Sequence, residues 1–420
     1  MWHERTRRGG ATRRARATLV ATAGFFALAI SACDLTVTNP GPVPDSYLGN
    51  PAAHVGMVNG MGRALSDALN WVTLTGGAVS GEVVGSGNLI AFGVTLKQRV
   101  GELDPNEIND HWNRAQRARW VAEDGIRRMR EALGSEFGSS PLAARALLYA
   151  GYANRLLGEN FCDAVFDGGP IEPRARYFER AEAAFTEAIT VAQAAGVDPI
   201  ATAAVAGRAA VRVWLDDWTG AVADAQAVPK GFRYDAKMTS VHLDEYNRIV
   251  WATANQPFRT ISVVNTFYAD YYAETLDPRT PWDTLPGFPY GDSGDPPVRF
   301  YRQRKYTNRE DGIPLSKWEE MQLILAEARL RSGDWTGAMT IINDLRAEAG
   351  VEPWSAANEV EAWERLKRER GIVLWLEGRR LGDLHRWREA GTPGANPDDV
   401  GQDSCFPIGQ DERDTDPNIN

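Results

Sequence analysis

The side chains most suggestive of catalysis lie near the C-terminus, where glutamates, arginines and an aspartate recur between residues 369 and 383. Glycoside hydrolysis needs two carboxyl groups about 5 to 10 Å apart. Along one helix, the eight positions between Glu369 and Glu377 correspond to a rise of about 12 Å, which is too long. We therefore predict a structural network in which each charge needs its partner, a structural or exposed position for His385, and no catalytic residue.

A second motif, Gly291-Asp292-Ser293-Gly294-Asp295-Pro296, is similar to the sequence around the nucleophile of trypsin-like proteases. Such a serine needs a histidine base, and no histidine stands in a matching setting, so we interpret the motif as a turn. Its aspartates leave calcium binding open, although they fall short of an EF-hand. Gly85-Ser86-Gly87-Asn88 lacks the strand and third glycine of a phosphate-binding loop, and no His/Cys cluster has zinc spacing. We predict that the protein is not an enzyme, and we assign it no metal or cofactor.

The remaining residues with binding chemistry are the aromatic side chains of residues 232–306, a segment with 15 aromatic residues and many prolines. This composition favours long loops with few short strands, one of them at Thr260–Val264, over helices. Sugars bind flat aromatic rings beside amide, carboxylate or guanidinium groups. The candidate ligand-binding residues are Tyr268, Tyr271, Tyr272, Trp282 and Tyr290, with Arg279 and Asp283. The alternative for each ring is that it packs the loops onto the helices.

The N-terminus has the pattern of a targeting segment that is cleaved off. Six arginines precede an uncharged stretch of 14 residues, Leu19–Ala32, which is too short to span a bilayer as a helix. Ser31-Ala32 before Cys33 is typical of lipoprotein processing, so residues 1–32 are a predicted signal peptide and Cys33 the lipidated first residue. Asp34 leaves sorting between the inner and the outer membrane open.

Removal of this segment leaves a strongly acidic protein with two cysteines. The segment carries six arginines and one glutamate, so the formal net charge changes from −10 to −15, which argues against a nucleic-acid partner. Cys162 and Cys405 form an even pair in an oxidising compartment, and we predict a disulfide between them. Two separate buried thiols are the alternative.

The elements that must position these residues are mainly helical. Residues 33–50 are rich in proline and turn formers and predict an extended tether, followed by one domain over residues 51–420. Asp217-Trp218-Thr219-Gly220-Ala221 recurs 117 residues later as Asp334-Trp335-Thr336-Gly337-Ala338, each time between two segments with helical spacing. Such helix pairs cannot bury their apolar stripes alone, so they stack. The predicted pairs lie near residues 141–192, 200–228, 315–348 and 358–388, with the loop-rich insert at 232–306.

The C-terminal hundred residues carry a family resemblance in a series of spaced motifs. The motifs are Leu325-Ala326-Glu327-Ala328, Gly333-Asp334-Trp335, Asn343-Asp344-Leu345-Arg346, Glu369-Arg370, Glu377-Gly378-Arg379-Arg380, Asp383-Leu384-His385-Arg386-Trp387 and Phe406-Pro407-Ile408. In this order they resemble the SusD/RagB family of nutrient-uptake lipoproteins. Trp112, the helical stretch 145–158 and the lipidated start also fall where the family has them.

The resemblance implies an all-α fold, a superhelical stack of about four tetratricopeptide-like helix pairs with an aromatic, loop-rich ligand-binding subregion. It implies a lipid-anchored protein of the outer membrane, at the cell surface, that binds a nutrient such as a glycan or oligosaccharide. The partner would be a SusC-like TonB-dependent barrel that receives the nutrient. A loop with Asn88, Phe92 and Arg99 would approach the ligand. The alternative is a tetratricopeptide-type protein–protein adaptor of an outer-membrane complex without its own small-molecule ligand.

Overall fold

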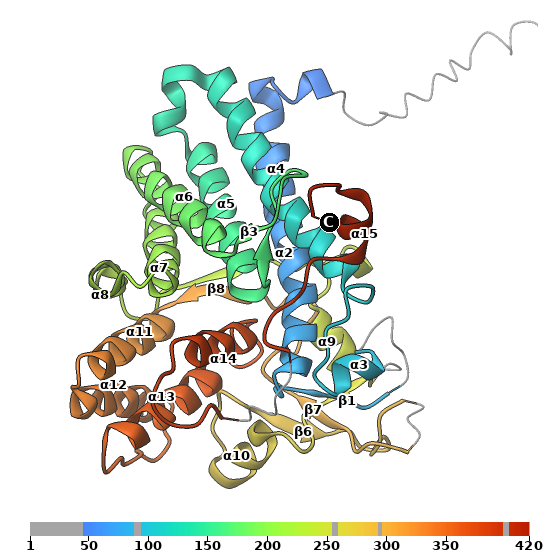
Figure 1. Ribbon diagram of the computed structural model, residues 1–420, viewed down its shortest axis with the longest axis vertical. Coiled ribbons are helices and arrows are strands. Elements are labelled where there is room, and N and C mark those ends of the chain that lie inside the picture. The colour runs from blue at the N-terminus through green and yellow to red at the C-terminus, as the bar shows by residue number, and fades with distance from the viewer. Residues whose placement is uncertain (1–44, 88–93, 254–258, 293–295, 398–402, 420) are drawn as a thin grey trace, which may run out of the picture. The chain divides into compact units, whose positions relative to one another are not determined.

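The computed structural model describes residues 45–87, 94–253, 259–292, 296–397 and 403–419 (Figure 1). Cys33, Asn88, Phe92 and Ser293 lie outside these residues, so what we expect of them remains a prediction. The described part is mainly helical, with strands that pair only two by two, which confirms the predicted all-α class. Within it, no helix is both long and apolar enough to cross a lipid bilayer.

The long helix α2 (His54–Val79) runs through the middle of the unit that begins at Leu48 (Figure 1). It contacts α4 (Asn109–Leu133) over much of its length. Gly125 of α4 makes this close approach possible, because a Cβ there would lie 2.0 Å from Cε of Met61. Before α2 in the sequence are two 3-10 turns, η1 (Asp45–Tyr47) and η2 (Pro51–Ala53); η1 lies within residues 33–50, so the predicted tether is not extended throughout.

Four couples of consecutive helices follow in the described residues, close to the ranges 141–192, 200–228, 315–348 and 358–388. They are α5 (Pro141–Asn160) with α6 (Ala175–Ala194), α7 (Asp198–Trp214) with α8 (Trp218–Ala227), α11 (Trp318–Arg331) with α12 (Trp335–Glu348), and α13 (Glu359–Val373) with α14 (Arg380–Glu389). Consecutive helices from α5 to α8 contact one another, α8 contacts α11, and α11 to α13 continue the stack. Figure 1 shows this stack down one side of the molecule.

The repeated Asp-Trp-Thr-Gly sequence is the start of the second helix in two of these pairs. Oδ1 of Asp217 accepts a hydrogen bond from the backbone N–H of Gly220 at 2.9 Å, and Asp334 accepts the equivalent bond from Gly337 at 2.9 Å. Each aspartate therefore caps the N-terminus of its helix. A Cβ at either glycine would lie within 2.3 Å of the aspartate carboxylate, which explains why glycine stands at both positions.

Small residues let the helices α5, α6 and α7 approach one another closely. The ring of Phe185 on α6 packs against both Gly151 of α5 and Gly207 of α7, where an added Cβ would lie 2.5 Å from the ring. Phe178 occupies the same kind of space beside Gly158. Aromatic side chains thus fill positions that the glycines leave empty, and the packing has no room for larger residues there.

The insert at residues 232–306 contains short strands, and it also contains two helices that the composition did not predict. These helices are α9 (Arg248–Thr253) and α10 (Phe267–Thr275). The expectation of loops and strands alone was wrong for α10 because Tyr268 and Tyr271, three positions apart, turn one helical face into the core. Thr266 caps this helix, and it ends at Leu276 in a left-handed conformation with φ 55°.

The strands form separate two-stranded antiparallel ladders. The pairs are β1 (Val84–Gly85) with β5 (Ile261–Ser262), β2 (Asp163–Ala164) with β3 (Glu172–Pro173), β4 (Arg233–Ala236) with β8 (Ile313–Lys317), and β6 (Trp282–Thr284) with β7 (Tyr301–Gln303). Strand β5 lies inside the predicted strand 260–264. The remaining short elements are α3 (Leu96–Arg99), η4 (Gly134–Ser139), η5 (Leu243–Glu245) and α15 (Gln410–Thr415).

A disulfide between Cys162 and Cys405 joins the end of α5 to the C-terminal segment, as predicted. The backbone N–H of Cys162 donates to the carbonyl of Phe406 at 2.9 Å, and the N–H of Phe406 donates to the carbonyl of Asn160 at 2.7 Å. Phe406 is fully buried. The bond therefore reinforces a segment that is also held by backbone hydrogen bonds and by an aromatic side chain in the core.

Candidate functional site

The charged run between residues 369 and 383 is buried and paired, which confirms the structural interpretation. The pairs include Glu369 with Arg346 at 3.1 Å, Glu377 with Lys317 at 2.6 Å, and Asp383 with Arg370 at 2.7 Å. His385 also has a structural contact, since its Nδ1 lies 2.7 Å from Oγ of Ser404. Because these carboxylates are enclosed and bound to cations, they are not available to a substrate.

Glu320 on α11 is the centre of this network. Arg155 of α5 donates to its carboxylate at 2.5 Å, and Arg370 of α13 and Arg379, which precedes α14, lie at 3.7 and 3.8 Å. Burial alone would raise the pKa of Glu320, but the three guanidinium groups outweigh burial and lower this pKa to about 2. One carboxylate therefore links helices from three of the four pairs.

Of the residues predicted to bind ligand, Tyr268 and Tyr271 belong to the core instead, and partly exposed Arg279 is held in ion pairs. Tyr268 is 2% exposed and stacks on Trp375, and the hydroxyl of Tyr271 donates to Asp277 at 2.7 Å. Arg279 lies between Asp277 and Glu369, with 2.5 Å to the glutamate. The alternative, that the rings pack the loops onto the helices, holds for both tyrosines, because the helical turns of α10 direct them inward.

The other predicted residues within the described part lie at or near the surface. Trp282 on β6 stacks on Tyr301 of β7, with ring centroids 4.3 Å apart and planes 7° apart, and Tyr272 meets its edge. Asp283 is bound by Arg302 through two bonds of 2.7 Å. Tyr290 is 42% exposed, and partly exposed Arg99 donates to the carbonyl of Gly87. The structure thus places Trp282 and Asp283 on one hairpin, with Tyr272 of α10 beside Trp282.

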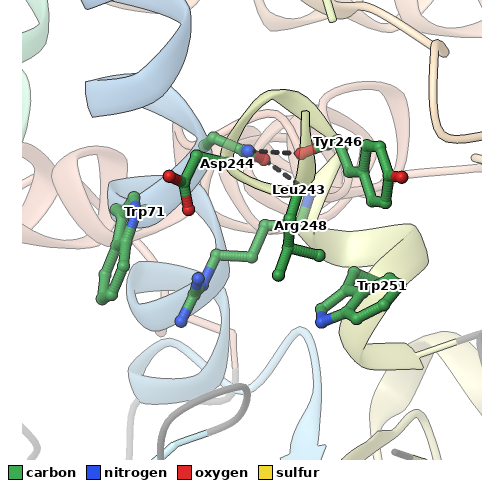
Figure 2. A pocket seen from close by; sticks show the side chains of 7 residues that line it. Trp71, Leu243, Asp244, Tyr246, Arg248 and Trp251 are labelled. Carbon is green, nitrogen blue, oxygen red and sulfur yellow. Dashed lines mark hydrogen bonds between the residues drawn. The ribbon is translucent and has the colours of Figure 1, made fainter. Parts of the chain in front are cut away.

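A second aromatic group, not predicted from the sequence, forms a pocket between α2 and the segment that leads into α9 (Figure 2). We call it the aromatic pocket, and its rings are Trp71, Tyr246 and Trp251, all partly exposed. Polar groups beside the rings come from Asn70, Asp244 and Arg248, and exposed Leu243 completes the lining. The pocket encloses about 40 Å³, which is room for a few water molecules, so a ligand would lie across it rather than inside it.

The side chain of Asn70 holds the two halves of the aromatic pocket together. Its amide nitrogen donates to the carbonyl of Tyr246 at 2.7 Å, and its oxygen accepts from the backbone N–H of Arg248 at 2.7 Å. Asn70 is 3% exposed. Because one amide satisfies both backbone groups, the segment from Tyr246 to Arg248 keeps its place on α2 before any ligand arrives.

Guanidinium groups lie over the rings of the aromatic pocket. Arg248 lies 3.7 Å and Arg114 4.7 Å from the centre of Trp71, and Arg309 lies 4.6 Å from the centre of Tyr246. Burial lowers the pKa of Arg248 to about 10, and Arg114 adds to this effect. Burial, with Arg248 and Arg114, also lowers the pKa of neighbouring His111 to about 3, so His111 is neutral at physiological pH. A ligand here would meet the charges of these arginines and of the exposed carboxylate of Asp244.

The arrangement offers groups suited to binding a ligand. Flat rings offer contact to apolar C–H faces, and guanidinium, amide and carboxylate groups can pair with hydroxyls. No group of three His, Cys, Asp or Glu residues in the described part could hold a metal ion. The sequence signal for this pocket was weak, since Tyr246 and Trp251 are only two of many aromatics in the insert and Trp71 lies on a distant helix.

Comparison with known proteins agrees with this architecture. Residues 301–418 match the sequence model of the SusD family, and a SusD superfamily protein from Bacteroides vulgatus superposes with a TM-score of 0.61 over 87% of this chain and 98% of its own, at 16% identity. The C-terminal part of the chain thus matches the SusD family, and the chain has the fold of SusD-like proteins. The family match covers the third and fourth helix pairs and the disulfide-linked C-terminal segment, whereas the aromatic pocket lies before it, except for Arg309.

Other SusD-like structures share the fold. A laminarin-binding SusD-like protein has a TM-score of 0.64 at 12% identity, with 88% of this chain and 98% of that chain covered. A SusD-like carbohydrate-binding protein from Bacteroides vulgatus has a TM-score of 0.57 at 14% identity, with 80% and 83% covered. No curated protein sequence matches this chain. At these identities the likeness establishes the SusD fold and leaves the ligand to be argued from the site.

Proposed function

We propose that this protein is a SusD-family surface lipoprotein that binds a glycan and delivers it to a SusC-like TonB-dependent barrel in the outer membrane. The observation that carries the proposal is the aromatic pocket, where Trp71, Tyr246 and Trp251 stand partly exposed beside Asn70 and Arg248. The apolar C–H faces of a sugar pack on aromatic rings, and its hydroxyl groups need hydrogen-bonding partners, so rings beside such groups suit a sugar.

The scaffold and the relatives support binding rather than turnover. The charged residues that could have formed a catalytic pair are instead consumed in a buried network that links the helix pairs. Two of the SusD-like proteins with this fold are described as binding laminarin and carbohydrate, which favours a glycan over other nutrients here. Lipidation of Cys33 would tether the protein to the membrane without a spanning helix.

The ligand site is tested with two tryptophan variants in the full-length protein. We expect Trp251→Ala to weaken binding of a glycan found in an oligosaccharide panel by at least about tenfold, which corresponds to about 1.4 kcal/mol. Trp282→Ala is the matched variant, because Trp282 is also partly exposed but lies on the β6–β7 hairpin, next to Tyr272 of α10. Isothermal titration measures both affinities, and circular dichroism checks that both variants fold.

The two variants separate the possible results. Loss of affinity only in Trp251→Ala supports the aromatic pocket, and loss in both means that the ligand also contacts the hairpin predicted from the sequence. Loss only in Trp282→Ala moves the site to the hairpin. If no panel member binds the unmodified protein while it co-purifies with an outer-membrane barrel, the adaptor function replaces this proposal.

A further inference from the structure

A second cavity adjoins the aromatic pocket and offers a ligand more room. We call it the polar cavity; its lining includes Gly60, Arg63, Asp67, Arg114, Arg117 and Asp244. It encloses about 360 Å³, which is in the range of ligand-binding pockets, whereas the aromatic pocket encloses only about 40 Å³. Most of the space available to a ligand therefore lies beyond the aromatic rings.

Two residues connect the polar cavity to the aromatic pocket. Asp244 lines both, and Arg114 lines the polar cavity while its guanidinium lies 4.7 Å from the centre of Trp71 in the aromatic pocket. A chain molecule with one unit on Trp71 therefore meets Arg114 and can continue into the larger cavity. One ligand can use both spaces without a change in the fold.

The arginines deepest in the polar cavity are already paired with carboxylates. Arg63 lies 3.2 Å from Glu245 and 3.9 Å from Asp67. Arg114 lies 2.5 Å from Asp67 and 3.7 Å from Asp110. An anionic ligand group would have to compete with these carboxylates, and a cationic group would have to compete with the arginines. Since moving a charge out of water is costly unless it gains a partner, the cavity disfavours ligand groups of either sign.

The other two charged side chains of the lining do not change this balance. Arg117 and Asp244 have opposite charges, and both are exposed to solvent. Water and salt screen charges at such positions, so neither adds much attraction for a charged ligand. The polar cavity is thus rich in charged groups and yet favours a ligand without charge.

The paired groups can still bind hydroxyls. A guanidinium has several N–H donors and a carboxylate has several acceptor positions, more than one ion pair occupies. A sugar hydroxyl both donates and accepts, so it can bind to both members of a pair, such as Arg63 with Glu245, without separating them. Hydrogen bonds to charged partners are stronger than those between neutral groups, which favours this arrangement.

We infer that the ligand is an uncharged oligosaccharide chain, with one sugar on the aromatic pocket and the sugars that follow it in the polar cavity. This inference rests on the proposed function and names its substrate class and the need for more than a short chain. A disaccharide on the aromatic pocket would leave most of the available space empty. A longer chain fills that space and gains the hydroxyl contacts of the polar cavity, so its affinity is higher.

The first experiment varies the length and the charge of the ligand. Laminari-, cello-, malto- and chitin oligosaccharides of two and of six sugars are titrated into the full-length protein. A galacturonate hexamer beside its methyl ester, and a chitosan hexamer beside the chitin hexamer, test the two signs of charge. We expect at least one neutral hexasaccharide to bind at least about tenfold more tightly than its disaccharide, with less than about a twofold change when salt is raised. The charged hexamers should bind no more tightly than their neutral forms.

The results of this titration separate the inference from the proposed function. Equal affinity for the two lengths, or tighter binding of a charged hexamer than of its neutral form, overturns the inference and leaves the proposed function standing. No binding of any oligosaccharide overturns both.

A second experiment fills the polar cavity through Gly60. This glycine lines the cavity on α2, and a Cβ there would have no atom within 4 Å, so a larger side chain has room to extend over the cavity. Gly60→Phe should remove the additional affinity of the hexasaccharide and leave the disaccharide unchanged. Gly56→Phe is the matched control, because Gly56 also lies on α2 with no atom within 4 Å of its Cβ position but lines neither cavity.

Circular dichroism checks that both glycine variants fold. A hexasaccharide that is indifferent to Gly60→Phe, or that is weakened equally by Gly56→Phe, refutes the placement of the chain in the polar cavity.

Discussion

Replacement of Glu320 by glutamine tests whether the buried network holds the helix pairs together. The carboxylate is 1% exposed and faces Arg155, Arg370 and Arg379. Its pKa falls from the usual 4.5 to about 2, and this difference corresponds to about 3 kcal/mol in favour of the charged form. Removal of one partner from a buried ion pair costs about 3 to 5 kcal/mol, so both arguments give a similar magnitude.

The assay is denaturant unfolding at pH 7, with the free energy of unfolding compared between the original protein and Glu320→Gln. We expect a loss of about 3 kcal/mol. Because the folded-state pKa is lowered, the stability that Glu320 contributes is present above pH 4.5 and is lost as the pH falls through 2. The difference between the two proteins should therefore be constant above about pH 5 and shrink in acid.

The control is the neighbouring variant Glu319→Gln. Glu319 is partly exposed and has no ion-pair partner among the described residues, so its replacement should change the free energy of unfolding by less than about 0.5 kcal/mol. The reasoning is refuted if Glu320→Gln costs no more than Glu319→Gln, since the three arginines would then need no negative partner.

Three further predictions concern stability. Cys405→Ala opens a covalent link across 243 residues and should lower the free energy of unfolding by about 2 to 5 kcal/mol, while reducing agent should have no effect on the variant. Gly207→Ala places a Cβ 2.5 Å from the ring of Phe185 and should lower the free energy of unfolding, measured by thermal unfolding, by about 1 to 3 kcal/mol. The control Gly56→Ala on α2 has no atom within 4 Å of the new Cβ and should stabilise the protein by about 0.5 to 1 kcal/mol. Equal effects of the two variants would contradict the packing argument. Burial raises the pKa of Glu82 to about 7, so the stability that protonated Glu82 contributes is complete below pH 4.5 and is lost as the pH rises through 7. The stability of Glu82→Gln relative to the original protein should therefore increase by about 3 kcal/mol between pH 4.5 and 8. Parallel pH profiles of the two proteins would contradict this.

The helix pairs were predictable because their signals are local. The spacing of apolar residues at three and four positions lies within single helices, and the repeated Asp-Trp-Thr-Gly cap lies within two of the pairs, so no distant contact is needed to recognise them. The helix α2 was not predicted from such a pattern. Its buried residues lie on several faces, from Val58 to Val79, so the chain shows no single apolar stripe with a polar face opposite.

For the candidate binding residues, the sequence predicted the segment in which aromatic side chains gather, but not the individual residues that stay exposed. An aromatic-rich insert indicated where rings gather, but not which rings are buried, and Tyr268 and Tyr271 turned inward because the helix α10 forms. Trp282 and Asp283 stayed near the surface on a hairpin. Whether a ring packs or stays partly exposed depends on neighbours from elsewhere in the chain, and those neighbours are not visible in the local pattern.

By itself, the sequence determined the helical class, the four pairs, the pairing of two cysteines and the structural use of the charged C-terminal run, since each rests on short-range spacing or on a small number of candidates. Only the tertiary structure decided where a ligand can bind. The aromatic pocket depends on Asn70 bonding to Tyr246, 176 residues away. Contacts over such separations follow from how the whole core packs, which no local spacing encodes.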